Sequence, residues 1–124
     1  MAKVLVVDDS ALSRRTSRRI LEGAGHDVAE AADGLSALER YAVDRPDVVL
    51  LDVTMAEMNG LEVLGQLRAM DPDARVVMAT ADVQTSTRTL AEAGGAVGFV
   101  VKPLTSETVV RAVTAALAGQ GAAQ

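Results

Sequence analysis

The sequence contains no cysteine and only one histidine. Without cysteine the chain cannot form disulfides, thiolate nucleophiles or cysteine-ligated metal sites, and one histidine excludes a multi-histidine site within one chain. Any metal chemistry must therefore use hard oxygen ligands. The chain also lacks an uncharged stretch of the roughly 18 residues that a bilayer-spanning helix requires. We therefore expect a cytoplasmic protein without membrane insertion.

Basic residues are in the minority. Twelve lysines and arginines stand against seventeen acidic residues, which gives a formal net charge of -5. A chain with this balance lacks the general positive potential that attracts nucleic acids, so we expect no nucleic-acid partner. Its 124 residues, 49% of them hydrophobic, suffice for one folded domain but not for two. We expect that domain over residues 1–120, followed by a short flexible tail over residues 121–124.

Short aliphatic runs alternate with helix-length segments along the whole chain. This alternation predicts an α/β fold with a mostly parallel sheet. Two of the runs are continuously apolar, as is typical of central strands covered on both faces, and the second run is short and flanked by charge, as is typical of an edge strand. The expected strands are residues 4–7, 28–29, 48–51, 76–79 and 99–101.

The segments between these runs place apolar residues at helical spacing. The fourth segment, between residues 83 and 92, offers few apolar residues to bury, so we expect a loosely held helix there. The expected inner faces are Leu12, Thr16, Ile20 and Leu21 in the first helix, Leu35, Leu38, Tyr41 and Ala42 in the second, Leu61, Leu64 and Leu67 in the third, and Val109, Val110, Val113 and Leu117 in the last.

Polar side chains follow four of the five expected strands. Asp8 and Asp9 follow the first, Asp52 ends the third, Thr80 the fourth, and Lys102 follows the fifth. In a doubly wound sheet, ligands bind outside the carboxyl ends of the strands, so we expect these side chains to gather in one site. Each alone is more typical of a turn, a helix cap or a solvated charge. Only the combination indicates a site.

Clustered carboxylates repel one another unless a cation or a proton relieves them. With oxygen donors only, Mg²⁺ is the expected ion, and Mn²⁺ is the second choice. A metal with an ammonium and a hydroxyl opposite would form a receptor for a phosphoryl group, and a carboxylate can be the nucleophile. Asp52 is the expected nucleophile because it stands alone at the end of a central strand, whereas Asp8 and Asp9 together are typical of a metal cradle.

Several motifs carry a family resemblance. Residues 4–10 read VLVVDDS, residues 50–52 read LLD, residues 58–60 read MNG, residues 78–81 read MATA and residues 98–103 read GFVVKP. In this order and at these spacings they resemble the receiver domain of two-component response regulators over essentially the whole chain. The resemblance implies a flavodoxin-like (βα)5 fold with a doubly wound parallel five-stranded sheet in the order 2-1-3-4-5.

The resemblance also implies the chemistry of the site. Asp52 would accept a phosphoryl group from the phosphohistidine of a histidine kinase or a histidine phosphotransfer protein. Mg²⁺ would be held by Asp8, Asp9, Asp52 and the main-chain carbonyl of Thr54. The same domain would slowly hydrolyse its own acyl phosphate, and no dedicated enzyme acting on an external substrate is expected.

The resemblance further implies how the signal leaves the site. Thr80 and Lys102 would bind the phosphoryl oxygens, and Phe99 matches the aromatic switch that turns inward when Thr80 is drawn to the phosphate. A downstream protein, which the sequence does not identify, would then respond to the fourth and fifth helices and the fifth strand.

Other functions stay open at this point. The chain could be a phosphorelay intermediate or a phosphate sink without direct output, because both use the same chemistry. It could also be a small Mg²⁺-dependent phosphohydrolase that forms an aspartyl phosphate, although it has no cap segment to enclose a substrate and no acid two residues beyond Asp52. An interaction module with a vestigial site is the third alternative.

The first helix carries four arginines, which form two pairs at i,i+4 spacing on one broad face. These are Arg14, Arg15, Arg18 and Arg19. Such a face can simply be solvated, or it can dock a partner. Receivers that this chain resembles commonly place this helix against the helical bundle of the histidine-containing donor.

Overall fold

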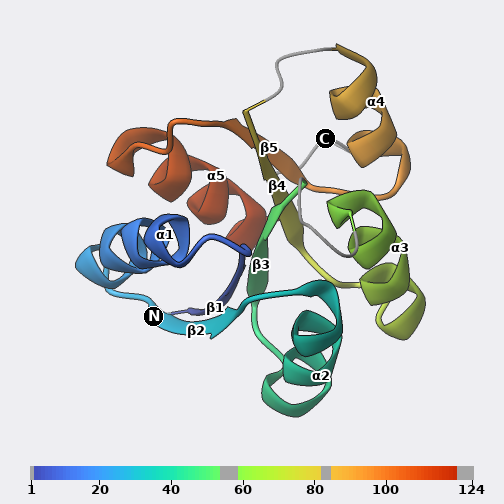
Figure 1. Ribbon diagram of the computed structural model, residues 1–124, viewed down its shortest axis with the longest axis horizontal. Coiled ribbons are helices and arrows are strands. Elements are labelled where there is room, and N and C mark those ends of the chain that lie inside the picture. The colour runs from blue at the N-terminus through green and yellow to red at the C-terminus, as the bar shows by residue number, and fades with distance from the viewer. Residues whose placement is uncertain (1, 54–58, 82–84, 120–124) are drawn as a thin grey trace.

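The computed structural model describes residues 2–53, 59–81 and 85–119. Its five strands form one parallel sheet in the order β2-β1-β3-β4-β5 (Figure 1). The strands are β1 (Lys3–Val7), β2 (Asp27–Ala31), β3 (Val48–Asp52), β4 (Val76–Thr80) and β5 (Gly98–Val101). The helices are α1 (Ala11–Gly23), α2 (Gly34–Asp44), α3 (Gly60–Met70), α4 (Thr85–Ala93) and α5 (Ser106–Leu117). The expected flavodoxin-like fold, its strand order and the edge position of β2 are confirmed.

Helices cover both faces of the sheet. In Figure 1, α1 and α5 lie on one side of the strands and α2, α3 and α4 on the other. Successive side chains of a strand point to opposite faces, so Val4 and Val6 join the core beneath α1 and α5 while Leu5 and Val7 join the core beneath α2, α3 and α4. The continuously apolar strands therefore fill two cores at once.

The expected inner faces of the first two helices are partly wrong. The residues expected inside but found exposed are Leu12, Thr16, Leu35 and Ala42. Helix α1 buries Leu21, as expected, together with Ser17, which was not expected. Arg18 beside them forms an ion pair with Glu30 of β2. The buried side of α1 is thus flanked by a polar contact with a neighbouring strand. The inner faces of α3 and α5 agree with the prediction, because Leu64, Leu67, Val109 and Val113 are buried.

Two expectations fall outside the described part of the chain. The predicted tail, residues 121–124, and the first residues of the predicted fourth helix both lie there. Among the helices in the described residues, none has the length and apolarity needed to cross a bilayer.

Candidate functional site

The carboxyl ends of four strands meet at one edge of the sheet. Asp8 directly follows β1, Asp52 ends β3, Thr80 ends β4 and Lys102 directly follows β5. The register aligns these ends, since Asp52 pairs with Ala79, the residue before Thr80. Asp8, Asp52 and Thr80 are all buried. The fold therefore brings together side chains that are separated by more than ninety positions.

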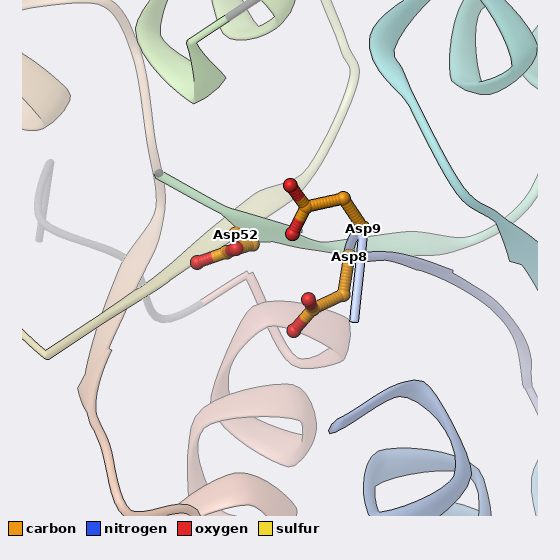
Figure 2. Close-up of side chains that lie close together, drawn as sticks. All are labelled: Asp8, Asp9 and Asp52. Carbon is orange, nitrogen blue, oxygen red and sulfur yellow. The ribbon is translucent and has the colours of Figure 1, made fainter. Parts of the chain in front are cut away.

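Three carboxylates lie close together at this edge (Figure 2). One oxygen from each of Asp8, Asp9 and Asp52 lies within 4.8 Å of the others. Asp8 is 4% exposed and Asp52 is 5% exposed, whereas Asp9 is open to solvent. At an effective dielectric constant near 20, two like charges at such a distance repel by about 3 kcal/mol. The cluster therefore needs positive charge nearby.

Lys102 supplies part of that positive charge. Its Nζ lies 3.2 Å from Oδ2 of Asp8 and 3.3 Å from Oδ1 of Asp52. Burial by itself lowers the pKa of Lys102, but attraction to Asp52 and Asp8 and hydrogen bonds to both outweigh burial, so the pKa is raised above its ordinary value. The ammonium thus stays charged. Lys102 contributes one positive charge beside two of the three clustered carboxylates, so negative charge remains in excess among these four side chains.

The donor set fits a divalent cation that prefers oxygen. The cluster offers carboxylate oxygens from two buried residues and one exposed residue, and Mg²⁺ is commonly held by a few carboxylates while it keeps some of its water. The excess negative charge favours the same ion. Thr54, the fourth ligand that the resemblance implies, lies outside the described residues.

Thr80 and Phe99, the two residues of the expected switch, lie on neighbouring strands. Thr80 is 1% exposed. Phe99 is half-buried, pairs in register with Met78 of β4 and packs against the core beneath α2, α3 and α4. The main-chain N–H of Lys102 donates to the carbonyl of Thr80 at 2.7 Å, which joins the ends of β4 and β5. A movement at Thr80 therefore has a direct structural route to β5.

Gly60 is a residue whose importance appears only in the folded chain. It begins α3 and packs on the main chain that carries Asp52, and its N–H donates to the carbonyl of Val53 at 2.7 Å. A Cβ at this position would lie 2.7 Å from Cα of Val53 and closer still to the carbonyl oxygen of Asp52. Only glycine lets the main chain approach so closely. The sequence contained this residue as part of the MNG motif but did not reveal the contact.

The four arginines of α1 do not share one environment. Nε of Arg14 lies 3.1 Å from Oε1 of Glu30, and Nη1 of Arg18 lies 2.6 Å from its Oε2. Only 18% of the Arg14 side chain is exposed. Arg15 and Arg19, in contrast, are exposed. The expectation of one solvated or docking face therefore fits Arg15 and Arg19 and is wrong for Arg14.

Comparison with known proteins decides the family. Residues 4–114 match the response regulator receiver domain family. The chain belongs to this family. It is 41% identical to the chemotaxis protein CheY of Listeria monocytogenes over 91% of this chain and 96% of that protein. It is 38% identical to CheY of Thermotoga maritima over 90% of this chain and 93% of that protein.

A solved structure supports the same assignment. The chemotaxis protein CheY4 of Vibrio cholerae superposes with a TM-score of 0.90 at 35% identity, over 94% of this chain and 99% of that one. The protein is thus a CheY-like response regulator receiver domain. Membership implies a histidine kinase as phosphodonor and a downstream target.

Proposed function

We propose that this receiver is phosphorylated on Asp52 and then switches conformation to control a partner protein. The donor is the phosphohistidine of a histidine kinase or a histidine phosphotransfer protein. A carboxylate oxygen of Asp52 attacks phosphorus, the bond between phosphorus and the imidazole nitrogen breaks, and the nitrogen keeps the electron pair. The product is an acyl phosphate. Water later hydrolyses it and ends the signal.

The observation that carries this proposal is the position of Lys102 between two buried carboxylates. Asp52 ends a central strand with its side chain buried, and the ammonium lies 3.3 Å from its Oδ1. An ammonium fixed there before the reaction can neutralise the oxygens of an arriving phosphoryl group without reorganising. Thr80, which ends the adjacent strand, is the candidate hydroxyl donor to the same oxygens.

Asp8, Asp9 and Asp52 would hold Mg²⁺, together with the main-chain carbonyl of Thr54. A bound Mg²⁺ supplies positive charge that offsets the carboxylates and the phosphoryl oxygens. The excess of carboxylates over ammonium in the cluster supports this assignment. Mn²⁺ suits the same donors.

The proposed output passes from Thr80 to Phe99. A phosphoryl group on Asp52 would draw in the Thr80 hydroxyl, and Phe99 would turn into the space beside it. Phe99 also lines a groove of about 450 Å³ between β5 and α5, together with the half-exposed Val101 and with Ala112. Because one side chain belongs to both the expected switch and this groove, a partner bound there would sense the change.

The proposal includes a single receiver domain over residues 1–120 that works in the cytoplasm. A relay intermediate or a phosphate sink would share the phosphorylation of Asp52 and differ only in the later fate of the phosphoryl group. Binding partners therefore have to be sought with phosphorylated and unphosphorylated protein. A partner retained only by the phosphorylated form supports direct output, whereas onward transfer of the phosphoryl group to another histidine supports a relay.

The first step is tested with acetyl phosphate and Mg²⁺, followed by intact-mass measurement and peptide mapping. We expect one added phosphoryl group on Asp52, no addition in Asp52→Asn, and no addition when EDTA removes the metal. Asp73→Asn is the matched control, because Asp73 is an exposed aspartate between α3 and β4. A phosphoryl group on another residue would contradict the proposal. Rapid turnover of diverse phosphate esters would favour the hydrolase instead.

A further inference from the structure

Arg14 links the acidic cluster to the edge of the sheet. Its Nη1 donates to the main-chain carbonyl of Asp8 at 2.7 Å, and its Nε donates to Oε1 of Glu30 at 3.1 Å. The carbonyl of Asp8 belongs to the peptide unit that joins Asp8 to Asp9. One side chain therefore restrains the segment from which two of the three clustered carboxylates project.

Glu30 and Arg18 hold Arg14 in this position. The second carboxylate oxygen of Glu30 accepts from Nη1 of Arg18 at 2.6 Å, and Nε of Arg18 donates to Glu22 at 3.0 Å. The hydrogen bond from Arg18 holds the pKa of Glu30 below its ordinary value, so this carboxylate stays ionised. The contacts run from Arg14 to Glu30, Arg18 and Glu22, so cations and anions alternate and their charges balance.

The same segment is also restrained by other hydrogen bonds. The N–H of Asp8 donates to the carbonyl of Ala31 at 3.1 Å, and the N–H of Ser10 donates to Oδ1 of Asp8 at 2.9 Å. Both contacts fix Asp8 or the residue after Asp9, whereas the bond from Arg14 acts on the peptide between the two aspartates. It is also charge-assisted and therefore stronger than a neutral hydrogen bond.

We propose that Arg14 is a positioning residue for the divalent-cation site, and that Glu30 fixes Arg14 for this task. The inference rests on the proposed function, because it assigns Asp8 and Asp9 to metal binding. When Arg14 is removed, the peptide between Asp8 and Asp9 loses its charge-assisted bond and is held less firmly. The carboxylates then no longer sit at the separation that suits one ion.

A positioning role and a purely electrostatic role predict opposite signs. By charge alone, removing the cation of Arg14 should strengthen Mg²⁺ binding, because one repulsion is lost. If Arg14 positions the carboxylates, the same change should weaken Mg²⁺ binding, although it makes the region more negative. Arg14→Lys keeps the charge but lacks the forked guanidinium, which can bond Asp8 and Glu30 at the same time. It should therefore give an intermediate result.

The experiment measures Mg²⁺ binding to the unphosphorylated full chain by titration of backbone amide NMR signals. We expect the dissociation constant to rise roughly tenfold in Arg14→Gln, at the lower end of the effect of removing a partner of a metal ligand. A smaller rise is expected in Arg14→Lys and Glu30→Gln. Arg19→Gln is the matched control, because it removes an exposed cation from the same helix and should leave binding unchanged. Unchanged or tighter binding in Arg14→Gln would overturn the proposal.

A second measurement separates this inference from the proposed function. Phosphorylation of Asp52 by acetyl phosphate is followed over a range of Mg²⁺ concentrations. Arg14→Gln should need more Mg²⁺ for half-maximal rate and reach nearly the wild-type rate at saturation. A lower maximal rate with the same Mg²⁺ dependence would contradict a role through the metal site. If the wild-type chain is not phosphorylated at all, the proposed function fails while the binding comparison still decides the role of Arg14.

Discussion

Replacing Lys102 with methionine should destabilise the fold and make its stability depend strongly on Mg²⁺. The ammonium lies 3.2 Å from Asp8 and 3.3 Å from Asp52, and each attraction is about 5 kcal/mol at an effective dielectric constant of 20. Much of this is offset, since burial opposes the charge of Lys102 and 23% of its side chain is exposed. We expect a net loss of about 2–3 kcal/mol, just below the usual cost of breaking a buried pair.

The assay is urea unfolding followed by far-ultraviolet circular dichroism, because the chain has no tryptophan. In EDTA the Lys102→Met variant should unfold at a clearly lower urea concentration than the wild type. In Mg²⁺ the difference should shrink, because a bound cation replaces the lost positive charge. Lys3→Met is the control: this lysine is exposed, so its loss should change the free energy of unfolding by less than about 0.5 kcal/mol.

The double variant Lys102→Met with Asp52→Asn tests the coupling between the two charges. Once Lys102 is gone, removing Asp52 relieves repulsion with Asp8 and Asp9, so the double variant should be more stable than Lys102→Met alone. The reasoning is refuted if Lys102→Met matches the wild type in EDTA. It is also refuted if Mg²⁺ stabilises both proteins equally, because the ammonium would then not be offsetting the carboxylates.

Other contacts predict three further outcomes. Ion pairing with α1 lowers the pKa of Glu30 from 4.5. The resulting stabilisation is therefore present above that pH and is lost as the pH falls through the lowered pKa, so Glu30→Gln should flatten the decline of the urea midpoint as the pH falls below about 4.5. Burial, with a hydrogen bond to Asp71, raises the pKa of Tyr41 to about 12; ultraviolet titration of this single tyrosine should show that value in the folded state and a lower one in Asp71→Asn, and phenolate formation near pH 10 would contradict it. Gly60→Ala should lower the free energy of unfolding by about 1–3 kcal/mol and slow the phosphorylation of Asp52 by acetyl phosphate. Phosphorylation at the wild-type rate would contradict the prediction, because the main chain would then accommodate the added Cβ without moving Asp52.

The strands, and the side chains that cluster at their carboxyl ends, could be predicted because their signals in the sequence are local. A continuously apolar run identifies a central strand whatever the rest of the chain does, and the residue after such a run lies at the ligand-binding edge by topology alone. The residues Asp8, Asp52, Thr80 and Lys102 therefore met at that edge as expected. Their grouping needed only the strand order, which the family motifs implied.

The inner faces of α1 and α2 and the supports of the site were not predictable in the same way. Leu12 looked like an inward residue because it is apolar, yet it is 72% exposed. Arg14 and Arg18 of α1 pair with Glu30, which lies on another element and has the sequence context of an ordinary edge-strand charge. The close approach of Gly60 to Asp52 likewise depends on how α3 enters the fold. Contacts of this kind have no local signature in the sequence.

The arginines of α1 show why spacing alone does not reveal function. Two i,i+4 pairs are equivalent on an isolated helix, but packing against β2 separates them. Glu30 and Glu22 together neutralise Arg14 and Arg18, so little of their charge remains to attract a partner. Any attraction toward a docking donor would come from the exposed Arg15 and Arg19. Adjacent residues of α1 would then serve two roles, Arg15 and Arg19 toward the donor and Arg14 toward the metal site. Single substitutions can separate these roles, whereas reversing the charge of the whole helix would change both at once.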